Sequence, residues 1–198
     1  EKVSSINLDS TIFSKKPGGT TVSASLRICK LASISVFVTG GIGGVHRDVS
    51  ESMDISSDLQ AIKESEIITV CAGPKTILDI SKTYELLETL SIPAFSYRQN
   101  NLPAFWYRDT KLISTHRVES PEAMAKIYSI ARSINCCNGL LLCNPIPKKY
   151  SLDQMYLEPL ILDGVTELKK SNITGKELTP GLLKYLVEKT NGKTLFSN

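Results

Sequence analysis

The stretch that decides the fold is residues 67–75, which read Ile67-Ile68-Thr69-Val70-Cys71-Ala72-Gly73-Pro74-Lys75. An apolar, β-branched run closed by Gly-Pro predicts a buried strand that ends in a tight turn. Lys75 then lies at the carboxyl end of the strand, where open α/β sheets bind their ligands. Burial or a second cation lowers the pKa of a lysine and frees its amine to attack a carbonyl carbon. A surface lysine in a loop has the same local sequence, so the neighbouring segments must decide.

Outward from this strand, apolar runs alternate with segments of helical periodicity, which indicates an α/β layer fold. We expect strands over 35–38, 67–71, 92–97 and 139–143, and helices over 20–32, 54–65, 82–90, 152–170 and 180–190. Ser120-Pro121 predicts the start of one more helix, because serine is a favoured cap and proline fits the first helical position. The apolar positions of that helix recur at helical spacing: Ala123, Ile127, Ile130, Ala131 and Ile134.

Length and composition favour one globular α/β domain over residues 1–198, with 41% hydrophobic and 22% charged residues. A net charge of +3 is too small to indicate a nucleic-acid or membrane surface. The five cysteines form no CxxC motif, which argues against a disulfide framework and a zinc site. No apolar run approaches the ~20 residues that span a bilayer. We therefore expect an intracellular, most simply cytoplasmic protein, unless an organellar targeting segment has been lost.

Two glycine-containing segments predict an anion site. Gly18-Gly19-Thr20-Thr21-Val22 offers backbone N–H groups and hydroxyls at a helix start, which suits a phosphate but also describes ordinary capping. Residues 38–47 carry four glycines and then His46 and Arg47, which add positive charge beside a backbone that a ligand can approach closely. The glycine spacing matches neither a dinucleotide-binding fingerprint nor a Walker loop.

A third segment carries two carboxylates. Asp54 and Asp58 are four residues apart and share one face if the segment is helical. Such a pair suits a divalent cation or acid/base chemistry, and a solvated helix start gives the same pattern. With Lys75, the three segments predict a phosphorylated carbonyl compound or sugar as the substrate.

Five stretches, in the same order and over nearly the whole chain, resemble the pseudouridine-5′-phosphate glycosidase family, also called the indigoidine synthase A-like family. They are 18–24, 36–47, 54–59, 70–75 and 144–147. The resemblance implies a three-layer α/β/α fold with a mixed, mostly parallel central sheet. It also implies reversible cleavage of the C–C glycosidic bond of pseudouridine 5′-phosphate to uracil and ribose 5-phosphate through a lysine Schiff base.

The resemblance further implies roles for individual residues. Lys75 matches the Schiff-base nucleophile, Asp58 a proton shuttle, and Asp54 a carboxylate that binds Mn²⁺ or another divalent cation. The implied substrate contacts are Lys2, Thr21, Val22, Thr39, His46, Ser56, Ser57, Asp58 and Asn198. Lys2 is expected on the phosphate and Asn198 near the base.

The resemblance also implies a homotrimer, and an N-terminal segment with a glutamate proton donor and a last C-terminal helix that this chain lacks. Residues 1–198 are therefore expected to be a fragment of a longer enzyme. Two alternatives stay open. One is another Schiff-base lyase or aldolase that acts on a sugar phosphate, and the other is a non-catalytic phosphosugar-binding module.

Overall fold

The computed structural model describes residues 1–173 and 177–197. Its strands are β1 Lys2–Val3, β2 Gly19–Thr20, β3 Val36–Val38, β4 Ile68–Cys71, β5 Ala94–Tyr97, β6 His116–Val118 and β7 Leu140–Cys143. Its helices are α1 Leu8–Ser14, α2 Val22–Leu31, α3 Val49–Ser52, α4 Ser57–Ser65, α5 Ile80–Thr89, α6 Pro121–Ser133, the 3-10 turn η1 Lys148–Tyr150, α7 Gln154–Lys170, α8 Leu178–Lys189 and α9 Lys193–Ser197. The expected strands and helices are all present, with ends shifted by a few residues.

The main sheet has the strand order β3-β4-β7-β5-β6, and all of its pairs are parallel. β7 therefore lies between β4 and β5, with Cys143 beside Cys71. β1 and β2 form a separate parallel pair, and antiparallel pairing among the described residues is limited to isolated bridges such as Val45–Ile55. Parallel strands place all their carboxyl ends at one edge, which is where the Lys75 turn begins.

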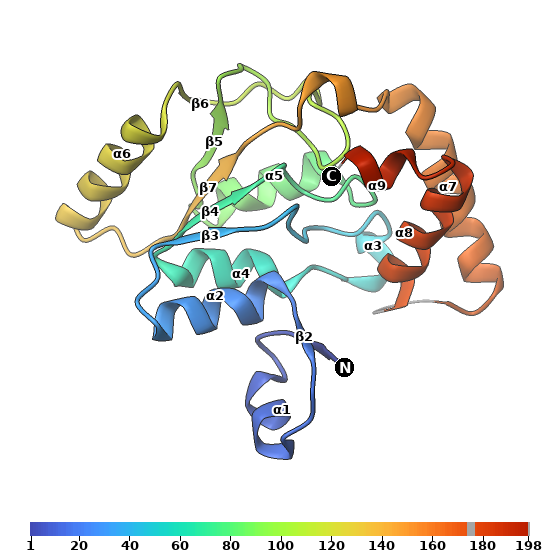
Figure 1. Ribbon diagram of the computed structural model, residues 1–198, viewed down its shortest axis with the longest axis horizontal. Coiled ribbons are helices and arrows are strands. Elements are labelled where there is room, and N and C mark those ends of the chain that lie inside the picture. Colours follow the sequence, from blue (N-terminus) through green and yellow to red (C-terminus); the bar gives the residue numbers. More distant parts are fainter. Residues whose placement is uncertain (174–176, 198) are drawn as a thin grey trace.

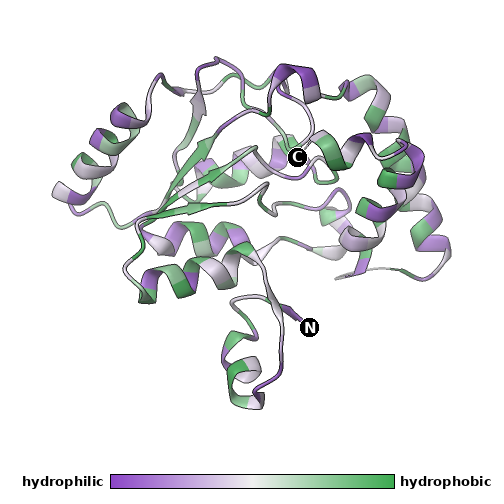
Figure 2. Ribbon diagram, in the orientation of Figure 1, coloured by the Kyte–Doolittle hydropathy of each residue, from purple (hydrophilic) through white to green (hydrophobic). Residues whose placement is uncertain are grey.

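Helices cover both faces of the sheet, which confirms the three-layer prediction (Figure 1). Leu26 of α2, Leu59 of α4 and Leu87 of α5 share one core with Cys71 and Leu141. The opposite face packs against α6 through a second core, formed by Ile68, Phe95, Val118, Met124, Leu140 and Leu142. Figure 2 shows apolar colour along the strands and in stripes on the helices, as expected for elements that bury one side.

The start of α6 confirms the helix-start signal, because the Ser120 hydroxyl accepts a hydrogen bond from the Ala123 N–H at 3.2 Å. The apolar face expected for this helix is partly wrong. Met124 is 2% exposed, whereas Ile130 and Ile134 are 59% and 69% exposed. α6 contacts the core of the sheet through Met124, Ile127 and Tyr128, and Ile130 and Ile134 lie outside this packed face.

The last helices build a further core beyond the carboxyl ends of β3 and β4 (Figure 1). Leu157 and Ile161 of α7 pack with Leu182 and Leu186 of α8, and all four are at most 1% exposed. The same core contains Ile77 and Leu78, which follow Lys75, together with Trp106. In the described ranges no helix is both long and apolar enough to cross a bilayer.

Candidate functional site

A cavity of about 640 Å³ opens at the carboxyl ends of β3 and β4. Its wall contains every predicted site residue that the structure describes: Lys2, Thr21, Val22, Thr39, His46, Asp54, Ser56, Ser57, Asp58 and Lys75. Asn198, predicted near the base, lies outside the described residues. Side chains up to 73 positions apart along the chain are thus gathered around one hollow, as the resemblance implies.

Lys75 is held by a turn that requires glycine. Gly73 has a φ of +103°, and a Cβ placed there would lie 2.3 Å from the Pro103 carbonyl oxygen. The Lys75 N–H donates to the Ile42 carbonyl oxygen at 3.0 Å, which fastens the turn to the glycine loop, residues 39–47. Burial lowers the pKa of Lys75, and the charge of Lys2 lowers it further, while Asp58 acts in the opposite direction. The amine is therefore easier to deprotonate than an ordinary lysine.

Asp58 is 5% exposed, and both of its carboxylate oxygens accept backbone N–H bonds. Oδ1 accepts from Ser23 at 2.9 Å and Oδ2 accepts from Gly43 at 2.8 Å. The Asp58 N–H donates to the Ser56 hydroxyl, which caps α4. Asp58 therefore joins the start of α2 and the glycine loop to α4, in addition to facing the cavity.

Asp54 does not share a helix face with Asp58, so that expectation is wrong. α4 begins only at Ser57, because Met53 is left-handed with a φ of +51° and Ser56 provides the cap. The Asp54 carboxylate instead lies at the cavity, where Oδ2 is 3.7 Å from Nε2 of His46.

The side chains around Asp54 that could bind a metal ion supply few ligands, so they suit only a site in which water or substrate provides the others. No group of three or more His, Cys, Asp or Glu side chains suited to a metal ion occurs in residues 1–173 and 177–197. One carboxylate with nearby hydroxyls fits a hard divalent cation that keeps several water ligands, as Mg²⁺ does. Such a cation would be held by Asp54 together with substrate oxygens and water.

In the first segment expected to bind an anion, residues 18–22, two of the backbone N–H groups are already hydrogen-bonded within the protein. The N–H groups of Gly19 and Thr21 already donate to the carbonyl oxygens of Glu1 and Val3, at 2.9 and 2.7 Å. Thr20 and Thr21 nevertheless line the cavity beside Lys2. An anion there would therefore meet the ammonium of Lys2 and two threonine hydroxyls rather than a cradle of free amides.

Arg47 was expected to provide positive charge for the anion together with His46, and this expectation is wrong. Its guanidinium forms a forked ion pair with Glu158 of α7, at 2.7 and 3.1 Å. Arg47 is not among the residues that line the cavity. His46 does line it, so the glycine loop contributes one of its two basic residues.

Five cavity residues lie outside the segments that sequence reasoning singled out: Ser4, Ile6, Leu78, Phe105 and Thr179. Phe105 reaches the site because its N–H donates to the Pro74 carbonyl oxygen at 3.2 Å. Its ring packs so closely on Gly41 that a Cβ there would lie 2.4 Å from it. The tight packing explains that glycine, but nothing in the sequence links it to an aromatic residue so far along the chain.

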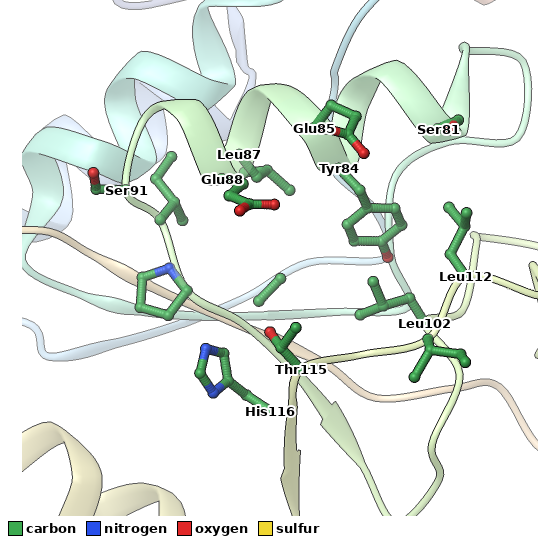
Figure 3. A pocket seen from close by; sticks show the side chains of 14 residues that line it. Ser81, Tyr84, Glu85, Leu87, Glu88, Ser91, Leu102, Leu112, Thr115 and His116 are labelled. Atoms are coloured by element: carbon green, nitrogen blue, oxygen red, sulfur yellow. The ribbon is translucent and has the colours of Figure 1, made fainter.

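A second hollow of about 420 Å³ lies between α5 and the starts of β5 and β6 (Figure 3). Tyr84, Leu87 and Leu102 are buried residues of its wall, and Glu85 and Glu88 belong to the solvent-exposed face of α5. It contains none of the predicted site residues. The predicted site residues in the described part of the chain therefore line the Lys75 cavity and not this second hollow.

Comparison with known proteins identifies relatives of this chain. Two curated relatives are both called pseudouridine-5′-phosphate glycosidase. The protein from Staphylococcus aureus is 42% identical over 197 residues, covering 100% of this chain and 64% of the relative. The protein from Petrotoga mobilis is 44% identical over 179 residues, covering 90% of this chain and 58% of the relative. The chain thus spans about six-tenths of the length of these relatives.

Solved structures share the fold. An indigoidine synthase A-like protein from Thermotoga maritima superposes with a TM-score of 0.92 at 37% identity, covering 100% of this chain and 64% of the other. The prealnumycin C-glycosynthase, solved in complex with ribulose 5-phosphate, superposes with a TM-score of 0.91 at 30% identity, covering 99% and 65%. The family model described as "Indigoidine synthase A like protein" matches residues 1–198. The chain therefore belongs to the indigoidine synthase A-like family.

Proposed function

We propose that this protein reversibly cleaves the C–C glycosidic bond of pseudouridine 5′-phosphate to uracil and ribose 5-phosphate, with Lys75 as the Schiff-base nucleophile. The observation that carries the proposal is the Lys75 amine, whose pKa is lowered by burial and by Lys2, in a cavity at the carboxyl edge of the sheet. The names of the curated relatives and the ribulose 5-phosphate complex of a structural neighbour support a sugar phosphate as ligand.

The chemistry explains why a lysine is needed. In an ordinary glycoside an acid protonates the leaving oxygen, but a carbon-linked base offers no such atom. In the direction of synthesis, the Lys75 amine condenses with the C1 aldehyde of open-chain ribose 5-phosphate and releases water. C5 of uracil attacks the iminium carbon and then gives up its proton to a base. Ring closure by a sugar hydroxyl displaces the lysine, and cleavage runs through the same steps in reverse.

The cavity residues supply the other functions. Lys2, Thr20 and Thr21 lie together on the wall and are assigned to the phosphate, the most highly charged part of the substrate. Asp58 is assigned to the proton transfer, because its charge acts on Lys75 and its oxygens each keep a free lone pair. Thr39, His46, Ser56 and Ser57 complete the polar wall.

Asp54 is proposed to bind Mn²⁺ or a similar cation, which would place positive charge beside the oxygens of the bound substrate.

The assembly is proposed to be a homotrimer, as the family resemblance implies. Light scattering of the purified protein measures that state directly, and a monomer at micromolar concentration would contradict it.

Borohydride trapping tests the Schiff base. The protein is incubated with ribose 5-phosphate and sodium borohydride, and the adduct is located by mass spectrometry of its peptides. We expect one reduced adduct on Lys75, its loss in Lys75→Arg, and its retention in Lys82→Arg, which changes an exposed lysine on α5. Absence of an adduct on Lys75 overturns the proposal.

The same assay separates the alternatives. Consumption of uracil together with ribose 5-phosphate supports the glycosidase. Trapping of the sugar phosphate without uracil consumption favours another Schiff-base lyase or aldolase. Binding of ribose 5-phosphate without any trapping favours a phosphosugar-binding module, for which the lowered pKa of Lys75 has no use.

A further inference from the structure

Arg47 ties the residues that follow Lys75 to helix α7. Its guanidinium donates through Nε to the Ile77 carbonyl oxygen at 3.1 Å and through Nη2 to that of Thr76 at 2.9 Å. Nη1 and Nη2 also donate to the two carboxylate oxygens of Glu158, at 2.7 and 3.1 Å. One planar side chain therefore connects the glycine loop, the Lys75 turn and α7.

The environment of this pair makes it firmer than an ordinary surface ion pair. The side chains of Arg47 and Glu158 are only 26% and 29% exposed. A forked arginine–carboxylate pair fixes both position and orientation, whereas an exposed single-contact pair contributes little. Tyr107 lies in the same surroundings, and its pKa is raised by burial and by the charge of Glu158. The guanidinium is thus already neutralised within the protein.

We infer that Arg47 and Glu158 are positioning residues for Lys75. They fix the backbone of Thr76 and Ile77, and so set the direction in which the Lys75 side chain enters the cavity. The near side of the turn is fixed independently, through the Lys75 N–H. Neither Arg47 nor Glu158 lines the cavity, so both act through the backbone. The inference rests on the proposed function, since the direction of an amine matters only if that amine reacts.

Two conservative substitutions test the pair, and the chain offers a matched control. Arg47→Lys keeps the charge but loses the fork, and Glu158→Gln keeps the shape but loses the charge. Lys169 of α7 pairs with Asp48, the residue beside Arg47, at 3.0 Å. Lys169→Gln therefore breaks a second link, between α7 and the residue that follows the glycine loop, without touching the carbonyls of Thr76 and Ile77.

We expect the rate of borohydride trapping at Lys75 to fall about ten- to hundredfold in Arg47→Lys and in Glu158→Gln, because misplacing a reacting group by about 1 Å has effects of that size. The ribose 5-phosphate concentration for half-maximal trapping should change little, and Lys169→Gln should trap at nearly the normal rate. The double variant should lose no more than either single one, since both remove the same link.

Ribose as a second substrate distinguishes the positioning role of Arg47 from direct binding of the phosphate by Arg47. A lost phosphate ligand would slow trapping of ribose 5-phosphate much more than trapping of ribose. A misplaced Lys75 slows both equally, so the ratio of the two rates should stay at its normal value. A fall in that ratio in Arg47→Lys would overturn the inference.

Hydrogen–deuterium exchange judges the positioning without any chemistry at Lys75. The amides of residues 75–79 should exchange faster in Arg47→Lys and Glu158→Gln, and at the normal rate in Lys169→Gln. The amides of β4 and β7 serve as a control, because their exchange reports on global unfolding. Unchanged exchange at 75–79 refutes the positioning role even where trapping is lost. If the unmodified protein forms no adduct, the proposed function fails, and the exchange result still decides on positioning.

Discussion

Lys75 lies between a cation and an anion that change its pKa in opposite directions. Burial lowers that pKa most, Asp58 raises it, and Lys2 lowers it. In the proposed mechanism the neutral amine is the nucleophile, so the trapping rate should increase as the pH rises through the pKa of Lys75. Binding of a phosphate beside Lys2 would weaken the effect of the Lys2 charge on the pKa of Lys75. Phosphate binding and the protonation of Lys75 would then be coupled.

Removing the charge of Lys2 should therefore shift the pH profile. In Lys2→Gln the pKa of Lys75 rises, so the midpoint of the trapping rate moves to higher pH and the rate at neutral pH falls. Ribose, which carries no phosphate, is the substrate for this measurement, because its use separates the charge effect from phosphate binding. Lys126→Gln, on α6, is the control. A profile that does not move in Lys2→Gln contradicts the linkage.

Asp54 permits a test of the metal assignment. Asp54→Asn removes the only carboxylate proposed as a ligand, so Mn²⁺ affinity should fall about 10- to 100-fold, a range reported even for changes around a metal's ligands. Electron paramagnetic resonance of free Mn²⁺ measures binding without relying on activity. Asp163→Asn, on the exposed side of α7, should bind as the unmodified protein does. Equal affinity in both variants excludes Asp54 as the ligand.

At the scale of elements, α5 supports the glycine loop from behind. Gly44 packs on Thr83 of α5, where a Cβ would lie 2.4 Å from Cγ2, and the Val45 N–H donates to the Thr83 hydroxyl at 3.0 Å. Gly44→Ala must push the loop away from the helix, at a cost of about 1–3 kcal/mol in the free energy of unfolding. Gly19→Ala meets no atom within 4 Å and should change stability by less than about 0.5 kcal/mol. Urea denaturation measures both, and equal losses would contradict this packing.

Long apolar runs made the main elements predictable from sequence. Residues 139–143 and 67–71 are bounded by turn residues and form β7 and β4. β1, β2 and α3 were not predicted, because they are short and carry no apolar run, whereas the equally short β3 was predicted from its consecutive apolar residues. Neither the strand order nor the exposure of Ile130 can be read from a local pattern, since both depend on which elements meet in space.

The candidate site was predictable where its chemistry is local. Lys75, His46 and the residues around Asp58 follow strands or glycines and were recognised, although their roles remain predictions. Arg47 was misjudged because its partner Glu158 is 111 positions away. Asp54 was placed on a helix because both Asp54 and Ser56 are residues that can cap one, and the structure starts the helix only after Ser56.

At the scale of the whole molecule, one carboxylate connects helices on opposite faces of the sheet. Glu66, which ends α4, pairs with Lys30 of α2 at 2.9 Å and with Arg132 of α6 at 3.2 Å. The bond from Lys30 contributes most to lowering the pKa of Glu66, and Arg132 lowers it further. Through these two ion pairs, Glu66 connects the helix layers on the two faces of the sheet just before β4 begins.

This carboxylate should contribute to resistance against acid. A group whose pKa is lowered in the folded state stabilises it above the unfolded value, here 4.5, and loses that contribution as the pH falls through the folded value. Glu66→Gln should therefore lower stability at neutral pH and flatten its decline below pH 4.5. Urea midpoints across that range measure the effect, with exposed Glu167→Gln as the control. If the stability of Glu66→Gln and of the unmodified protein declined in parallel with falling pH, this role of the Glu66 ion pairs would be contradicted.

The position of β7 has a consequence for how the protein is made. β4 and β5 leave the ribosome well before β7, yet each pairs with β7 and not with the other. A nascent chain that has not reached residue 139 must hold two apolar strands apart or pair them wrongly, and both states expose surfaces that aggregate. Completion of the sheet, and of the edge that carries Lys75, therefore waits for the insertion of a strand synthesised some seventy residues after β4. A chaperone that shields this gap during synthesis would favour the correct strand order.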